Sequence, residues 1–159
     1  MQCRASLCGT IGLLQQLLFL LSLHLRRSGR EVHTSDLRVH VAAAGLYTYP
    51  DASVVCGEPE FPDSQLDTLT NPILLAEILS ASTERYDRTF KVHAYRTIPS
   101  LRECLLIAQD QHHVALHRRM PDGSWSVFES RGRDATLELT SIDYTLRLDE
   151  LYETALPPD

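Results

Sequence analysis

Glu77 is the residue of this sequence that most clearly calls for a chemical explanation. It stands inside the run from Ile73 to Leu79, a short apolar stretch typical of a buried strand. An ionised carboxylate taken out of water is costly unless it is hydrogen-bonded, ion-paired or bound to a metal. Glu77 is therefore the first candidate for chemistry, and a buried ion pair with an arginine is the structural alternative.

A helix predicted after this strand carries three further candidates. Asp87, Lys91 and Tyr95 follow one another at spacings of four, which places them along one stripe of a helix. Lys91 is the only lysine in the sequence, and the other fourteen residues of the Lys and Arg total are arginines. Asp87 and Lys91 could equally form an ordinary surface pair, and Tyr95 could equally belong to the core.

A second carboxylate, Asp51, directly precedes the run 52–56 (ASVVC), which is predicted to be a central strand. If this strand and that of Glu77 are neighbours, both carboxylates converge at one sheet edge. Hard oxygen ligands of this kind suit Mg²⁺ or Mn²⁺, and a lysine beside the metal could orient or deprotonate a water. The pattern thus suggests metal-assisted phosphodiester hydrolysis, while a turn-capping role after Pro50 is the alternative for Asp51.

The composition sets broader limits. The chain has 159 residues, enough for one domain with a core, and its net charge of −6 argues against broad, charge-driven nucleic-acid binding. Cys56 and Cys104 lie in apolar runs without a CxxC pair, which predicts reduced thiols buried in strands and a cytoplasmic protein. His113 and His117 lie in an alternating segment, where solvated surface histidines are expected.

The opening residues allow three interpretations. The run from Ile11 to Leu25 is shorter than a membrane span and is interrupted by polar residues. A signal peptide would need a small-residue cleavage site where Arg26 and Arg27 stand. The simplest interpretation is a hydrophobic first helix that packs on the sheet and ends at Ser28–Gly29, so no membrane association is expected.

The remaining elements follow in order along the chain. A half-buried strand is predicted from near Glu31 to Val41, an exposed loop over 57–71, a strand over 101–108, and a hairpin with arms 113–119 and 124–130. A strand over 135–140 and a short helix over 148–154 complete the chain. This order implies an α/β (α+β) protein with a mixed sheet flanked by helices.

Four segments closely resemble the bacterial Uma2 family of endonucleases, which belongs to the PD-(D/E)XK, restriction-endonuclease-like superfamily. They are TSDLRVHV (34–41), YTYPDASVV (47–55), LLAEILSASTERYDRTFK (74–91) and YRTIPSLRECLLIAQD (95–110), in the family's order. The resemblance implies a restriction-endonuclease-like mixed central sheet with a C-terminal β-hairpin extension. It divides the chain into a hydrophobic N-terminal helix (1–30), a nuclease domain (31–153) and a tail (154–159).

Carried over residue by residue, the resemblance implies a catalytic set. Asp51 matches the Asp of the PD motif and Glu77 the following acid, as ligands of Mg²⁺ or Mn²⁺ together with the backbone carbonyl of Ile78. The lysine usually two places after the acid is missing, because Leu79 is there, and Lys91 matches a lysine displaced onto the helix. Asp87 and Tyr95 match supporting positions. Asp36 is a supporting candidate that shares a strand face with Arg38 and is expected to form a structural pair with it.

The sequence also departs from the family. Ala81 stands where the family usually has proline, and Cys104 replaces a usual aromatic residue. The N-terminus looks truncated or altered, so the alternative to a Mg²⁺-dependent DNA endonuclease is an inactive relative that binds nucleic acid or protein. DNA is the expected substrate. A homodimer is possible on the same resemblance, because members of the superfamily often dimerise to cut two strands.

Overall fold

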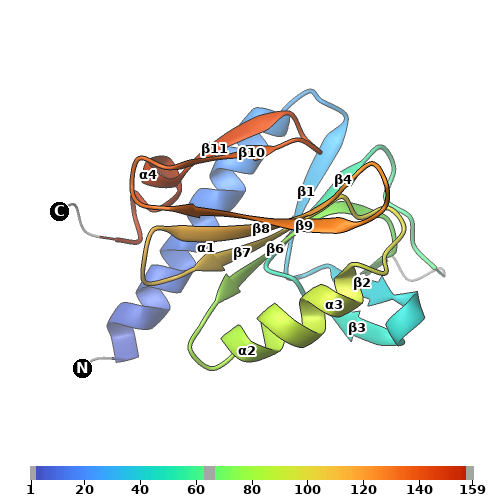
Figure 1. Ribbon diagram of the computed structural model, residues 1–159, viewed down its shortest axis with the longest axis horizontal. Helices are drawn as coiled ribbons and strands as arrows, with labels where there is room; N and C mark the ends of the chain where they lie inside the picture. The colour runs from blue at the N-terminus through green and yellow to red at the C-terminus, as the bar shows by residue number, and fades with distance from the viewer. Residues whose placement is uncertain (1–2, 63–66, 157–159) are drawn as a thin grey trace.

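A six-stranded mixed sheet with helices on both faces forms the protein in this computed structural model, which describes residues 3–62 and 67–156 (Figure 1). The strand order is β1-β4-β6-β7-β8-β9, with β6 and β7 parallel and all other neighbours antiparallel. This is the mixed sheet that the sequence predicts. The sheet strands are β1 (Arg30–Thr34), β4 (Ala52–Cys56), β6 (Pro72–Leu79), β7 (Glu103–Ala108), β8 (His113–Arg119) and β9 (Trp125–Arg131).

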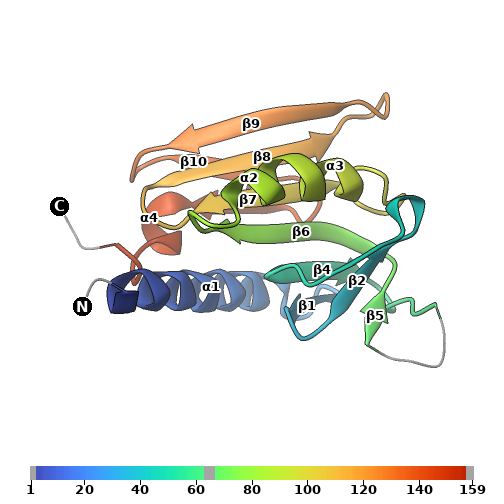
Figure 2. The same ribbon diagram turned by 90° about the horizontal axis from the view of Figure 1, so that it is seen from below.

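One face of the sheet is covered by helix α1 (Cys3–Leu25), which runs along it in Figure 2. Leu13, Leu17 and Leu21 of α1 are fully buried in one core with alternate residues of β4, β6, β7 and β8. The smaller sheet of β10 (Thr136–Leu139) and β11 (Tyr144–Arg147) and helix α4 (Leu148–Leu151) share this core. The predicted packed first helix is therefore present. Along the described chain, no helix combines the length and apolar character needed to cross a membrane.

The other face is covered by one continuous helical segment made of α2 (Glu84–Tyr86), a π-helical turn η2 (Asp87–Lys91) and α3 (Val92–Tyr95). Its apolar side packs on the alternate residues of the same strands, including Leu75 and Leu106. A three-stranded sheet completes this second core. Its strands are β2 (Arg38–Val41), β3 (Leu46–Thr48) and β5 (Thr68–Leu69), with the short 3-10 helix η1 (Ala42–Ala44) between the first two.

Two sequence-based predictions about the strands are wrong. The single strand expected from near Glu31 to Val41 is split by a turn at 35–37 into β1 and β2, which belong to different sheets. The loop expected over 57–71 contains β5, which is buried and pairs in parallel with β2. Both errors have one cause, because these short strands gain their stability from partners distant in the sequence and not from local periodicity.

Candidate active site

Strands β4 and β6 bring Asp51 and Glu77 to the same level of the sheet. Their antiparallel register pairs Ala52 with Ala76. Asp51, just before Ala52, therefore lies opposite Glu77, just after Ala76. The Asp51 carboxylate accepts a 2.7 Å hydrogen bond from the backbone N–H of Ile78. The predicted convergence of the two carboxylate positions is therefore confirmed, and the Ile78 backbone lies directly beside them.

The Glu77 side chain points toward the helical segment on the second face of the sheet. Its neighbours on that face of β6, Leu75 and Leu79, are buried in the second core, and Glu77 itself is only 3% exposed. Its Oε1 atom accepts a 2.5 Å hydrogen bond from the Tyr95 hydroxyl and a 3.1 Å hydrogen bond from Lys91 Nζ. Among the described residues, both donors reach Oε1 and none reaches Oε2.

The π-helical turn places Lys91 between two carboxylates. The backbone N–H of Val92 donates to the carbonyl of Asp87, five residues earlier, as in a π-turn, a feature often found at functional sites. Lys91 Nζ lies 3.1 Å from Asp87 Oδ1 as well as from Glu77 Oε1. Asp87 is buried, so the predicted stripe faces the sheet, and the pairing is not an exposed surface bridge.

The Lys91 ammonium therefore contacts two buried carboxylates, and a third, that of Asp51, is close enough to be influenced by its charge. Burial raises the pKa of Glu77 to about 7, partly offset by Lys91 and Tyr95, and the nearby Asp51 raises it further. Burial also raises the pKa of Asp51, against the opposing effect of the Ile78 N–H. Burial lowers the pKa of Lys91, but Glu77 and Asp87 outweigh it, so the net pKa is raised and the group stays charged.

Tyr95 serves both the core and the site, the two alternatives left open by the sequence. Its side chain is fully buried, and its hydroxyl lies between Glu77 and the Thr48 hydroxyl, 3.4 Å away. Burial raises the pKa of Tyr95, and the adjacent Glu77 carboxylate raises it further. Thr48 was not among the site residues predicted from the sequence. The signal that could have pointed to it is its place in the segment YTYPD, three residues before Asp51.

Asp36 is not brought to this cluster by any contact of the described chain. It lies exposed in the turn between β1 and β2, where it accepts a 3.3 Å hydrogen bond from the Thr34 hydroxyl. Arg38 pairs instead with Asp67, at 3.6 Å. The expected Asp36–Arg38 pair on one strand face is therefore wrong, because the turn removes Asp36 from the strand.

The prediction that His113 and His117 are solvated surface residues is also wrong. His113 is buried, and its carbonyl accepts a hydrogen bond from the Tyr152 hydroxyl. His117 contacts Arg96 at 2.8 Å, and burial together with this guanidinium lowers the pKa of His117 to about 4. Both residues lie on β8, an inner strand of the sheet between β7 and β9, so an alternating pattern did not mean an exposed face.

Of the two strand cysteines, Cys104 is buried as predicted, whereas Cys56 is exposed at the end of β4. Neither contributes to a metal site. In residues 3–62 and 67–156 no group of three or more His, Cys, Asp or Glu side chains is arranged to hold a metal ion. A Mg²⁺ site needs fewer such side chains than this, because the ion keeps several waters and is often bound through one or two carboxylates.

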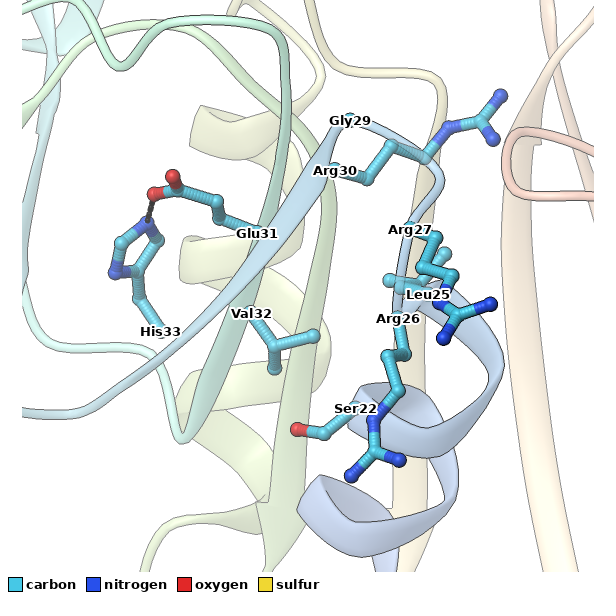
Figure 3. A pocket seen from close by; sticks show the side chains of 9 residues that line it. All are labelled: Ser22, Leu25, Arg26, Arg27, Gly29, Arg30, Glu31, Val32 and His33. Carbon is cyan, nitrogen blue, oxygen red and sulfur yellow. Dashed lines mark ion pairs between the residues drawn. The ribbon is translucent and has the colours of Figure 1, made fainter.

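A cavity of about 360 Å³ lies elsewhere, between the end of α1 and β1 (Figure 3). An ion pair of 3.4 Å joins Glu31 and His33 on its wall, and the side chains of Arg26 and Arg27 point away from that pair. Arg30 at this end of β1 pairs with Cys56, at the opposite end of β4 from Asp51. The cavity is therefore separate from the carboxylate cluster.

Comparison with known proteins assigns the family. A family model described as "Putative restriction endonuclease", Uma2, matches residues 12–149. The chain belongs to the Uma2 family. Two relatives from Synechocystis sp. strain PCC 6803 are the uncharacterized proteins sll1609, 39% identical over 69% of this chain, and slr1290, 34% identical over 81%. The chain spans 62% and 66% of their lengths.

A solved structure supports the fold of this Uma2 chain. It is the crystal structure of "a putative nuclease belonging to DUF820" from Anabaena variabilis, which superposes with a TM-score of 0.72. The similarity covers 93% of this chain and 82% of the other, at 19% sequence identity. At that identity the match establishes the nuclease-type fold, and the chemistry has to be argued from the residues themselves.

Proposed function

We propose that this Uma2 chain is a Mg²⁺- or Mn²⁺-dependent DNA endonuclease that hydrolyses phosphodiester bonds. The observation that carries the proposal is the gathering of three carboxylates, Asp51, Glu77 and Asp87, around Lys91, the one cation in contact with them in the described part of the chain. A divalent cation would balance their negative charge, and carboxylate oxygens are its preferred ligands. The family description, an endonuclease, agrees with this chemistry.

Asp51 and Glu77 would hold the ion, with the carbonyl of Ile78 as a further oxygen ligand. When bound, the metal would stabilise negative charge on a phosphate oxygen and favour ionisation of a water. Asp51 is already oriented by the Ile78 N–H, and Glu77 by Tyr95. The free Oε2 atom of Glu77 is the oxygen available for coordination in this arrangement.

Lys91 would position the attacking water or the phosphate by donating hydrogen bonds. Its pKa is raised by the two carboxylates, so a charged donor suits this role better than a base. Asp87 holds the ammonium in place from the opposite side, at 3.1 Å. The helix thus supplies the cation that Leu79, buried on the strand, cannot supply.

The proposal is tested by nicking of supercoiled plasmid in Mg²⁺ or Mn²⁺, with EDTA as the blank. Glu77→Gln, Asp51→Asn and Lys91→Met should each lower the nicking rate by about 100-fold or more, since even indirect ligand contacts are worth about 10–100-fold. Glu84→Gln is the matched control, because Glu84 is an exposed carboxylate on the same helical segment. An RNA substrate in parallel establishes which nucleic acid is cut.

Equal nicking by parent and Glu77→Gln, or nicking that persists in EDTA, would contradict the proposal. DNA binding without any metal-dependent cleavage would instead support the non-catalytic alternative. Linearisation of the plasmid, as opposed to nicking alone, would indicate paired cuts. Sedimentation of the protein then tests whether a homodimer makes them.

A further inference from the structure

Two aromatic side chains stand exposed on the outer side of the helical segment that carries Lys91. Tyr86 and Phe90 are 48% and 50% exposed, although both are large and mostly apolar. Their rings stack on one another with centroids 5.3 Å apart and an interplanar angle of 25°. Together they form a stacked pair with nearly parallel planes, called here the Tyr86–Phe90 platform.

The platform borders the candidate active site. Tyr86 directly precedes Asp87, and Phe90 directly precedes Lys91, so buried charges and exposed rings alternate along one helical segment. Lys91 Nζ, which contacts Glu77, lies 6.0 Å from the centroid of the Tyr86 ring. A molecule that reaches the carboxylates along this side of the segment would therefore meet the platform.

The charges around the platform favour an anionic partner. Arg85 is exposed next to Tyr86 and has no ion-pair partner among the described residues, whereas Arg88, between the two rings in sequence, is paired with Glu84 at 2.8 Å. The whole protein carries −6, so the uncompensated Arg85 beside two exposed rings is a local departure from its average. Aromatic rings interleaved with arginines suit nucleic acid, with bases stacking on the rings and phosphates near the cations.

Stabilisation of the helix alone does not account for the platform. An aromatic pair at i and i+4 contributes only about 0.2–0.5 kcal/mol to a helix. Half of each ring remains in water beside a charged cluster, where polar residues would be expected if packing were the sole purpose. The face of each ring that is turned away from the other ring is thus available to a ligand with a flat, unsaturated surface.

We propose that the Tyr86–Phe90 platform stacks unpaired bases, so that the nucleic acid is engaged as a single strand or a locally opened duplex. Bases inside an intact duplex stack on one another and cannot also lie on a protein ring. The inference rests on the proposed function for the identity of the substrate. It concerns binding, however, and can be measured without metal or cleavage.

The test is the affinity of the whole chain for a fluorescein-labelled dT12 strand and for the dT12–dA12 duplex, by fluorescence anisotropy in EDTA at low salt. We expect the single strand to bind at least about tenfold more tightly than the duplex. Phe90→Ala and Tyr86→Ala should each weaken dT12 binding about 5- to 100-fold, the loss typical of one stacked base. Phe90→Trp should keep the affinity.

Phe19→Ala is the matched control, because Phe19 is 58% exposed on α1, across the sheet from the platform. Phe90→Leu keeps an apolar contact for Tyr86 but removes the flat ring, so it separates stacking from helix stability. Circular dichroism of each variant verifies the fold. The proposal is overturned if the duplex binds as tightly as dT12, if no oligonucleotide binds, or if Phe90→Ala behaves like Phe19→Ala.

The outcome is distinguishable from that of the nicking assay. Platform-dependent dT12 binding without metal-dependent nicking would uphold the platform and reject the enzyme. Nicking that requires Glu77 but is indifferent to Phe90→Ala and Phe90→Leu, on single-stranded and supercoiled DNA alike, would uphold the enzyme and reject the platform.

Discussion

Two glutamates on neighbouring parallel strands are both buried, yet their surroundings differ. Glu103 at the start of β7 is fully buried and contacts Arg118 at 2.8 Å, the backbone N–H of Thr140 at 3.1 Å and that of Ser141 at 3.0 Å. The two hydroxyls of Thr140 and Ser141 also donate to it. Glu77 has two donors, both on one oxygen, and lies near Asp51.

The difference shows that burial alone does not identify a reactive carboxylate. Glu103 is satisfied on both oxygens by the protein, which joins β7 and β8 to the turn after β10. Glu77 retains an oxygen without a donor among the described residues and has excess negative charge beside it. We therefore assign a structural role to Glu103 and keep Glu77 as the candidate for a role in catalysis.

The largest expected effect is on stability, from Glu103→Gln. The substitution leaves the Arg118 guanidinium without its carboxylate, and breaking a buried ion pair typically costs about 3–5 kcal/mol. The free energy of unfolding, measured by urea denaturation, should fall by that amount at pH 7. Glu129→Gln, at an exposed carboxylate of β9, is the control and should change it little. A loss below about 1 kcal/mol for Glu103→Gln would place the stabilisation elsewhere.

Glu77 should instead make the protein less stable as the pH rises. Its pKa is about 7 in the folded protein and 4.5 in the reference state, so the folded form binds more protons between these values. Stability from this group is complete below about pH 4.5 and is lost as the pH rises through about 7, by on the order of 3 kcal/mol. Urea denaturation from pH 4 to 8 measures the slope.

Glu77→Gln should abolish that slope, since glutamine does not titrate. The variant should be more stable than the parent at pH 8 and similar to it at pH 4. Parallel pH curves for the two proteins would show that the pKa of Glu77 is not raised. Glu103→Gln provides the contrast, because it should lower stability without removing the slope between pH 4.5 and 7.

Metal binding should depend on pH through the same group. Below about pH 7 an ion must displace the proton of Glu77, so its apparent affinity should rise by up to about tenfold per pH unit and then level off. Calorimetric titration with Mn²⁺ from pH 5.5 to 8 measures this, with proton release read from buffers of different ionisation enthalpy. An affinity that is constant across pH 5.5–7 would exclude Glu77 as a ligand that titrates.

The smallest expected effect is that of Tyr95→Phe. In the parent, the 2.5 Å hydrogen bond from Tyr95 lowers the pKa of Glu77. Its removal should raise that pKa, so the midpoint of the stability slope should move to higher pH. The loss of stability should be about 1 kcal/mol, typical of one hydrogen bond. Thr48→Val, which removes the 3.4 Å contact with Tyr95, should shift the midpoint less. Equal shifts would mean that Tyr95 acts on Glu77 only through packing.

Much of the site could be predicted from the sequence because its signals are local. Glu77 inside an apolar strand and Lys91 as the single lysine are visible in the letters alone. The spacing of four from Asp87 to Tyr95 also predicted their common stripe, although a π-turn interrupts the helix there. The strands β4, β6 and β7 were predicted because their apolar runs are long and bounded by turn residues.

Only the tertiary structure decided which of these groups meet. The level of Asp51 opposite Glu77 depends on the β4–β6 register, and the reach of Lys91 depends on how the helical segment packs on the sheet. The same is true of Glu103, whose sequence context resembles that of Glu77 but whose donors come from the turn after β10. The local sequence pattern specifies the helices and strands, whereas the pairing of segments distant in the sequence sets the contacts between side chains. Those contacts determine which buried carboxylate keeps an oxygen without a hydrogen-bond donor.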